Sequence, residues 1–154
     1  MAIYELSNEL IFPNPELGEE DGLLAFGGDL SMERLLLAYS NGIFPWYNEG
    51  EPIMWWSPRP RFIIKPDEIR ISKSMRKIIR KSQFKVTFNN DFEGVISNCK
   101  SMRENNEGTW ITDDMKDAYI NLFKNGYAEH LESMGAKMVP FDEFKAMLHR
   151  GIYD

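Results

Sequence analysis

The stretch "GIFPWYNEGEPIMWWSPRPR", residues 42–61, crowds large rings and prolines together and so decides how this part of the chain can fold. It holds three of the four tryptophans of the 154-residue chain (Trp46, Trp55 and Trp56) and four of its eight prolines. Because proline interrupts helices and central strands, we expect an extended, irregular course. Core packing explains each ring taken singly. The cluster is equally suited to form the wall of a pocket, where rings stack on a nucleic-acid base or enclose an apolar side chain.

Helical patterns flank this stretch on both sides. Ser31 is expected to cap a helix over "MERLLLAYSN", which Gly42 would close. Thr112 is expected to cap another helix, which Gly126 would stop. Three more helices are predicted at residues 72–82, at residues 91–99 and in "FDEFKAMLHR" after Pro140.

Short strands are predicted between the helices. The segment "PRFIIK" is rich in β-branched residues, and "QFKVTF" alternates apolar with polar residues. Residues 1–30 are expected to be rich in loops, with a glycine turn at Gly27 and Gly28. Helices mixed with short strands predict an α+β fold.

Composition restricts the class of protein. The length predicts one domain, or one domain with a small appendage, and 43% hydrophobic residues allow a packed core. The apolar runs are all shorter than the roughly 20 residues that span a bilayer. The N-terminus has Glu5 and Glu9 but no basic residue, so it does not resemble a secretory signal and a cytoplasmic location is predicted. The single cysteine, Cys99, is expected to be a small buried residue, and His130 and His149 lack the spacing of metal ligands, so no metal site is predicted.

Positive charge gathers in the middle of an acidic chain. Residues 65–103 hold ten basic and four acidic side chains, although the whole chain has a net charge of -6. The helix predicted at residues 72–82 places five cations on one contiguous face, at Lys73, Arg76, Lys77, Arg80 and Lys81. Met75, Ile78 and Ile79 are expected to turn inward. A polyanion such as a phosphate backbone suits this stripe, but so does simple solvation of a surface helix.

Several motifs resemble one family, the leucyl/phenylalanyl-tRNA–protein transferases. They are "FPNPE", "DGLLAFGGDLS", "RLLLAYSNGIFPWY", "PIMWWSPRPR", "ISKSMRK" and "EGTWIT", between about Phe12 and about Ala128. The resemblance implies a bacterial cytoplasmic aminoacyltransferase without metal or diffusible cofactor. Such an enzyme moves leucine or phenylalanine from leucyl-tRNA or phenylalanyl-tRNA to the N-terminal Arg or Lys of an acceptor protein, which marks that protein for degradation through the N-degron pathway.

The resemblance also implies roles for particular residues. Tyr39, Trp46 and Trp110 match positions that line the pocket for the aminoacyl-adenosine end of the tRNA. The basic helix of residues 72–82, with its five cations, matches the helix that contacts the acceptor stem. Trp55 and Trp56 are assigned to the supporting core. The catalytic base is left unassigned.

The chain departs from the family pattern near Ala128–Glu129. There "NGYA" continues directly into "EHLESMGAKMVPFDEF", which resembles the family's C-terminal stretch, with Phe141 where an Arg is usual. The family's central block, which belongs to an acyltransferase-like (GNAT) core and carries "GESMF"-type and "DCQ"-type segments, is missing. We therefore expect an N-terminal tRNA-side domain over residues 1–128 and a remnant of the GNAT-like domain over residues 129–154.

Three functions follow as alternatives. The chain is an aminoacyltransferase with the activity of its family, or a non-catalytic aminoacyl-tRNA-binding remnant that lacks the acceptor site. The remnant is the physical expectation for this chain, because transfer requires the acceptor amine to be held against the ester. The third alternative is a module that binds Pro-rich peptides through its Pro/Trp-rich surface.

Overall fold

A computed structural model describes residues 3–63, 65, 68–82, 84–87, 89–104 and 109–126, without the side chains of residues 103 and 104. The fold is α+β, as predicted. Residues 1–61 and 91–127 form one compact unit, and residues 62–90 belong to a second. The predicted domain boundary at residue 128 and the helix predicted after Pro140 lie outside the described residues. None of the described helices is long and apolar enough to cross a membrane.

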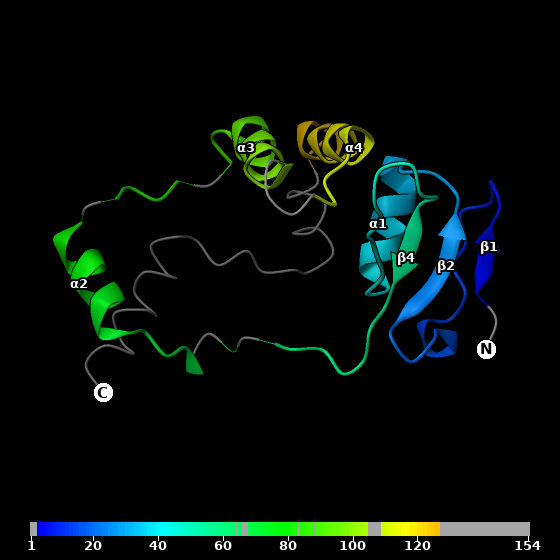
Figure 1. Ribbon diagram of the computed structural model, residues 1–154, viewed down its shortest axis with the longest axis horizontal. Helices are drawn as coiled ribbons and strands as arrows, with labels where there is room; N and C mark the ends of the chain where they lie inside the picture. Colours follow the sequence, from blue (N-terminus) through cyan, green and yellow to red (C-terminus); the bar gives the residue numbers. More distant parts are fainter. Residues whose placement is uncertain are drawn as a thin grey trace. The chain divides into compact units, whose positions relative to one another are not determined.

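A four-stranded sheet forms the centre of the first unit (Figure 1). The strands β1 (Tyr4–Leu6), β2 (Leu23–Gly27), β3 (Phe44–Pro45) and β4 (Met54–Trp56) lie in the order β1-β2-β4-β3. β1 runs parallel to β2, whereas β4 pairs antiparallel with both β2 and β3. The aromatic stretch therefore folds back on itself and supplies half of the sheet. Residues 1–30 are rich in loops, as expected, although β1 and β2 also lie there.

The core of this unit is built around Trp55. Its side chain is fully buried, its ring meets that of Phe12 edge-on at 4.9 Å, and its Nε1–H donates to the Gly27 carbonyl at 2.9 Å. Trp55 is thus a core residue, as expected. The other fully buried members of this cluster come from β2, from helix α1 and from the start of the aromatic stretch: Leu24, Ala25, Leu35, Ala38 and Ile43.

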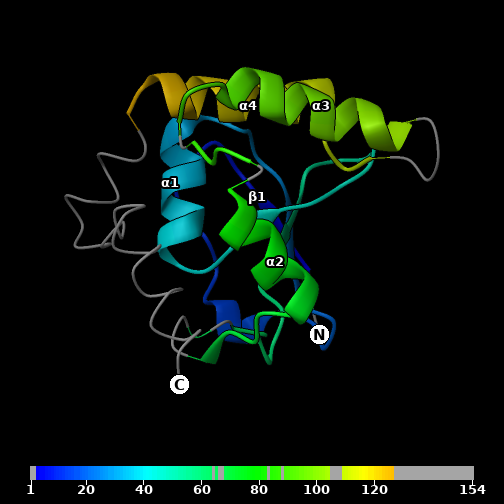
Figure 2. The same ribbon diagram turned by 90° about the vertical axis from the view of Figure 1, so that its left-hand side faces the viewer.

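Three helices complete the first unit, besides a short 3-10 turn at Pro15–Leu17 (η1): α1 (Met32–Ser40), α3 (Phe92–Glu104) and α4 (Asp113–Lys124). The predicted caps are confirmed, because the Ser31 hydroxyl accepts from the Arg34 N–H and that of Thr112 from the Met115 N–H. α4 contacts both α1 and α3, and it runs beside α3 in Figure 2. Helix α3 is longer than predicted, and Cys99 on it is exposed rather than buried.

A buried arginine, which the sequence patterns did not reveal, ties the N-terminal segment to α1. Arg34 has no exposed surface and donates to the carbonyls of Ser7 and Glu9 and to the carboxylate of Asp29. Burial tends to raise the pKa of the Asp29 carboxyl, but hydrogen bonds from Ser31 and Arg34 outweigh it and hold that pKa below its usual range. Gly28 lies so close that an added Cβ would stand 3.2 Å from the Arg34 guanidinium.

The second unit contains helix α2 (Lys73–Lys81), which lies within the range predicted for a helix and is capped by Ser72. The two predicted strands that flank α2 are absent from the described residues there. Phe62, Ile63, Phe84 and Val86 are 54–105% exposed. An extended segment becomes a strand only when another strand satisfies its backbone groups, and no described segment pairs with these two.

Candidate functional site

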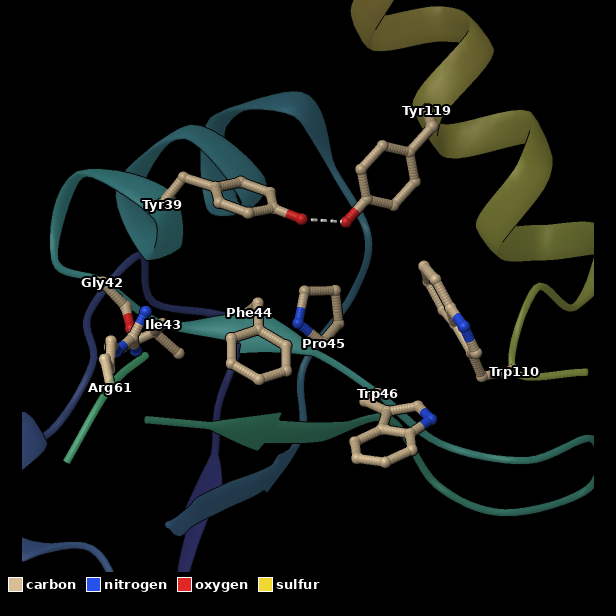
Figure 3. Close-up of a pocket in the computed structure, with 9 residues that line it drawn as sticks. All are labelled: Tyr39, Gly42, Ile43, Phe44, Pro45, Trp46, Arg61, Trp110 and Tyr119. Atoms are coloured by element: carbon tan, nitrogen blue, oxygen red, sulfur yellow. Dashed lines mark hydrogen bonds between the residues drawn. The ribbon is translucent and has the colours of Figure 1, made fainter. Parts of the chain in front are cut away.

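An apolar pocket of about 470 Å³ opens in the first unit beside β3 (Figure 3). The volume lies in the range of small-molecule sites. The pocket is lined by Tyr39, Gly42, Ile43, Phe44, Pro45, Trp46, Arg61, Trp110 and Tyr119.

The structure brings the three predicted pocket residues together from distant parts of the chain. Tyr39 lies in the last turn of α1, Trp46 follows β3, and Trp110 lies two residues before the N-cap of α4. Trp46 is 50% exposed and Trp110 is 36% exposed. Exposed indole surface at a pocket is available to a ligand, in contrast to the buried ring of Trp55.

Two hydrogen bonds hold the backbone of Trp46. Its N–H donates to the Met54 carbonyl at 2.9 Å, and its own carbonyl accepts from Trp56 Nε1 at 2.7 Å. The rings of Trp46 and Trp56 are 6.0 Å apart. Trp56 was expected in the core, but it is only partly buried and instead supports Trp46.

Tyr39 and Tyr119 link α1 to α4 across the pocket. Their hydroxyls are hydrogen-bonded to each other, and their rings meet edge-on with centroids 6.4 Å apart (Figure 3). The Tyr47 hydroxyl lies 3.4 Å from that of Thr112, the N-cap of α4, and provides a second polar link to this helix. Two phenol hydroxyls therefore supply polar groups in a lining that is otherwise mostly apolar.

Sequence reasoning missed three members of the lining that interact specifically. Tyr119 lies four residues after Met115, at the spacing of an apolar helix face, so its position in the sequence is equally typical of core packing. Phe44 and Arg61 lie within the aromatic stretch, and their pairing was not anticipated: the Arg61 guanidinium carbon lies 5.8 Å from the centroid of the Phe44 ring. A cation inside a stretch so rich in aromatic rings was the available signal.

The five cations predicted to bind tRNA all lie on α2, in the second unit. Lys73, Lys77, Arg80 and Lys81 are exposed. Arg76 is partly buried, and its Nε has no hydrogen-bond partner in the described part of the chain. Met75, expected to turn inward, is 49% exposed instead. The stripe therefore consists of four exposed cations and a fifth that is partly covered.

The side chains that line the pocket are mainly aromatic and apolar. The described members of the lining include no carboxylate, histidine, lysine, serine or cysteine. Within the described ranges, no three His, Cys, Asp or Glu side chains are close enough together to hold a metal ion. Aromatic faces, two phenol hydroxyls and one guanidinium can hold a flat ring, an apolar side chain and an anion.

Comparison with known proteins identifies the class to which this fold and pocket belong. Residues 28–59 match the family described as "Leucyl/phenylalanyl-tRNA protein transferase N-terminal domain", and residues 63–134 match "Leucyl/phenylalanyl-tRNA protein transferase". The chain belongs to the leucyl/phenylalanyl-tRNA–protein transferase family, as its motifs indicated.

Curated relatives carry the same family name. The chain is 54% identical over 131 residues to the leucyl/phenylalanyl-tRNA–protein transferase of Flavobacterium johnsoniae, covering 84% of this chain and 62% of the relative. It is 53% identical over 133 residues to that of Syntrophus aciditrophicus, covering 86% and 56%. The matches thus span about three fifths of the length of these relatives.

Proposed function

We propose that the pocket binds the 3′ aminoacyl-adenosine end of leucyl-tRNA or phenylalanyl-tRNA. The observation that carries this proposal is the convergence of Tyr39, Trp46 and Trp110 on one apolar pocket. Base stacking on an aromatic ring is worth about 1–3 kcal/mol, so two half-exposed indoles suit an adenine. The apolar remainder of the lining suits the side chain of leucine or phenylalanine.

The exposed cations of α2 are proposed to contact the acceptor stem of the same tRNA. Four exposed positive side chains on one helix favour phosphate contacts, since each contact releases condensed counterions. In this assignment residues 1–128 form the tRNA-side domain, and residues 129–154 are the remnant of a GNAT-like domain. A bacterial cytoplasmic setting and the tagging of acceptor proteins for degradation accompany the family activity.

The reaction of the family would transfer leucine or phenylalanine to the N-terminal Arg or Lys of an acceptor protein. In that reaction the α-amino group attacks the ester carbonyl, a C–N bond forms, and the tRNA leaves with its 3′-terminal hydroxyl. Most of the rate of such a step comes from holding the amine against the ester. No metal or diffusible cofactor is proposed.

A second candidate function is binding of aminoacyl-tRNA without transfer. Two observations favour it: the described lining offers no general base, and the matches cover only about three fifths of the relatives. A pocket that positions the donor but lacks a site for the acceptor amine would hold the ester without turning it over.

The test is transfer of labelled leucine from leucyl-tRNA to a peptide that begins with Arg, with leucyl-tRNA binding measured in parallel. Trp46→Ala and Trp110→Ala should each weaken leucyl-tRNA binding, whereas Phe84→Ala, in the second unit and 74% exposed, is the control and should not. Turnover by the unchanged chain supports the family activity. Binding without turnover supports the second candidate. If leucyl-tRNA does not bind to the folded chain, the pocket assignment is wrong.

A further inference from the structure

Arg61 is the one charged side chain among the described members of the pocket lining. Figure 3 shows it beside Gly42 at one end of the pocket, whereas Trp46 and Trp110 lie at the opposite end with Phe44 between. An apolar pocket with a cation at one end is complementary to a ligand with a flat ring at one end and an anion at the other.

The Arg61 side chain is exposed, but several contacts hold it in place. Its Nη2 donates to the Gly42 carbonyl and lies 3.4 Å from Ser57 Oγ, and Ser57 Oγ itself lies 3.3 Å from the Gly42 carbonyl. Ser57 is in turn fixed because its N–H donates to the Gly22 carbonyl at 2.7 Å. The guanidinium carbon also lies over the Phe44 ring, 5.8 Å from its centroid. A cation ordered in this way loses little conformational entropy when it binds an anion.

Donors remain on Arg61 after these contacts. A guanidinium carries five N–H donors, and both described hydrogen bonds start from Nη2. The donors of Nη1 and Nε have no hydrogen bond to a described residue, and no carboxylate in the described part of the chain forms an ion pair with Arg61. These donors belong to the planar fork with which arginine recognises phosphate.

We propose that Arg61 binds the 5′-phosphate of the terminal adenosine, the phosphodiester through which that nucleotide joins the rest of the tRNA. The proposal rests on the proposed function and deepens it, because it gives the nucleotide a direction in the pocket: adenine at the tryptophan end and phosphate at the arginine end. Arg61 is then a positioning residue, which favours a nucleotide at the end of a strand over a free aminoacyl-nucleoside.

Arg59 provides a matched control two residues away. It has the same charge and size, but it pairs with Glu16 at 3.2 Å on an exposed surface and does not line the pocket. Neutralising Arg59 changes the net charge of the protein as much as neutralising Arg61 does, so a difference between the two variants reports the site rather than the overall charge.

The experiment uses the full chain and a stable probe, 3′-deoxy-3′-(leucylamino)adenosine, in which an amide replaces the reactive ester. Its affinity is measured by calorimetry with and without a 5′-phosphate, for the unchanged chain and for Arg61→Met, Arg61→Lys and Arg59→Met. Inorganic phosphate is added as a competitor in a separate titration. The ratio of the two probe affinities is the gain due to the phosphate.

The unchanged chain and Arg59→Met should bind the phosphorylated probe on the order of tenfold to a hundredfold more tightly, the size expected for charge-assisted hydrogen bonds. This gain should shrink at high salt, vanish in Arg61→Met and fall to an intermediate value in Arg61→Lys, while affinity for the unphosphorylated probe stays constant. If Arg61→Met binds neither probe, the inference is tested with Arg61→Lys alone: a phosphate gain smaller than that of the unchanged chain supports it, and an undiminished gain contradicts it.

Two outcomes overturn the inference: no gain from the phosphate in the unchanged chain, or a full gain that survives in Arg61→Met. If neither probe binds the unchanged chain, the proposed function itself is wrong. This outcome differs from the two above, in which the unphosphorylated probe still binds. Strong competition by inorganic phosphate alone would show an anion site that does not require the nucleotide, and would also overturn the assignment.

Discussion

The aromatic stretch of residues 42–61 and the segment of residues 62–87 follow one another in the chain but differ in how they are supported. The first contributes β3 and β4 to the sheet, and one of its rings, Trp55, is fully buried. The described part of the second has no strand and no fully buried side chain, and its one long element is α2. The rings of the first segment are supported by strands and a core, whereas α2 is a helix of nine residues whose N-terminus is capped by its neighbour Ser72.

The difference matters for function because the two segments are proposed to bind different parts of one tRNA. A pocket for a base and an apolar side chain needs walls fixed by a core. A helix that contacts phosphates needs only exposed cations, since this attraction acts over several ångströms and carries no base recognition. Substitutions in the first segment should therefore affect stability where the ring is buried and binding where it is exposed, whereas substitutions of the exposed cations of α2 should affect binding alone.

The largest effect is expected for Trp55→Ala. It removes the fully buried ring that meets Phe12 and donates to the Gly27 carbonyl, so the free energy of unfolding should fall by about 3–5 kcal/mol. Denaturant unfolding followed by circular dichroism measures this change. Phe84→Ala, a ring that is 74% exposed, is the control and should change stability by less than about 0.5 kcal/mol. Equal losses in the two variants would mean that the sheet does not depend on Trp55.

Trp46→Ala should have the reverse profile. The ring is half exposed, and its residue is held by backbone hydrogen bonds that alanine retains, so the loss of stability should be well below that of Trp55→Ala. Affinity for leucyl-tRNA should fall by about 1–3 kcal/mol, the worth of one base stack. Filter binding of labelled leucyl-tRNA beside an unfolding curve gives both quantities. If the variant loses stability but keeps its affinity for leucyl-tRNA, Trp46 is a core residue and not part of the binding pocket.

Lys77→Gln should produce a smaller change, confined to binding. Lys77 is exposed on α2, so unfolding should be unaffected, whereas the slope of the logarithm of affinity against the logarithm of salt concentration should become shallower by about 1. Lys65→Gln is the control, because Lys65 belongs to the same unit but pairs with Glu68 at 2.9 Å. The phosphate role of α2 fails if the two variants have the same slope.

Local signals in the sequence predicted the helices well and the strands poorly. The caps Ser31, Ser72 and Thr112 form contacts within three residues, so a short stretch of sequence contains all the information. Strand pairing is decided by distant partners: Met54–Trp56 pairs with β2 and β3, while "PRFIIK" and "QFKVTF", with stronger strand patterns, have no described partner.

Some residues of the candidate site were likewise predicted from the sequence, and others were missed. Tyr39, Trp46 and Trp110 were singled out through motifs that resemble a family, and the pocket brings them together. Tyr119 and Arg61 were missed because their contacts, to Tyr39 across 80 residues and to Gly42 and Phe44 across the turn of the aromatic stretch, exist only in three dimensions. The burial of Arg34 was not predicted for the same reason, since its partners Ser7 and Glu9 lie more than 20 residues away in the sequence.

The smallest effect is expected for the stability of the protein in acid, to which Asp29 in the first unit contributes. Burial tends to raise the pKa of the Asp29 carboxyl in the folded protein, but hydrogen bonds from Ser31 and Arg34 outweigh this effect and lower that pKa from its usual value. A pKa lower in the folded than in the unfolded chain adds stability that is full above the unfolded value, about 3.9, and is lost as the pH falls through the folded value. Asp29→Asn should therefore be less stable than the unchanged chain at pH 6, and the gap should narrow steadily below pH 4. Denaturant unfolding at several pH values measures the gap. A gap that stays constant down to pH 2.5 would show that Asp29 stabilises Arg34 through shape rather than charge.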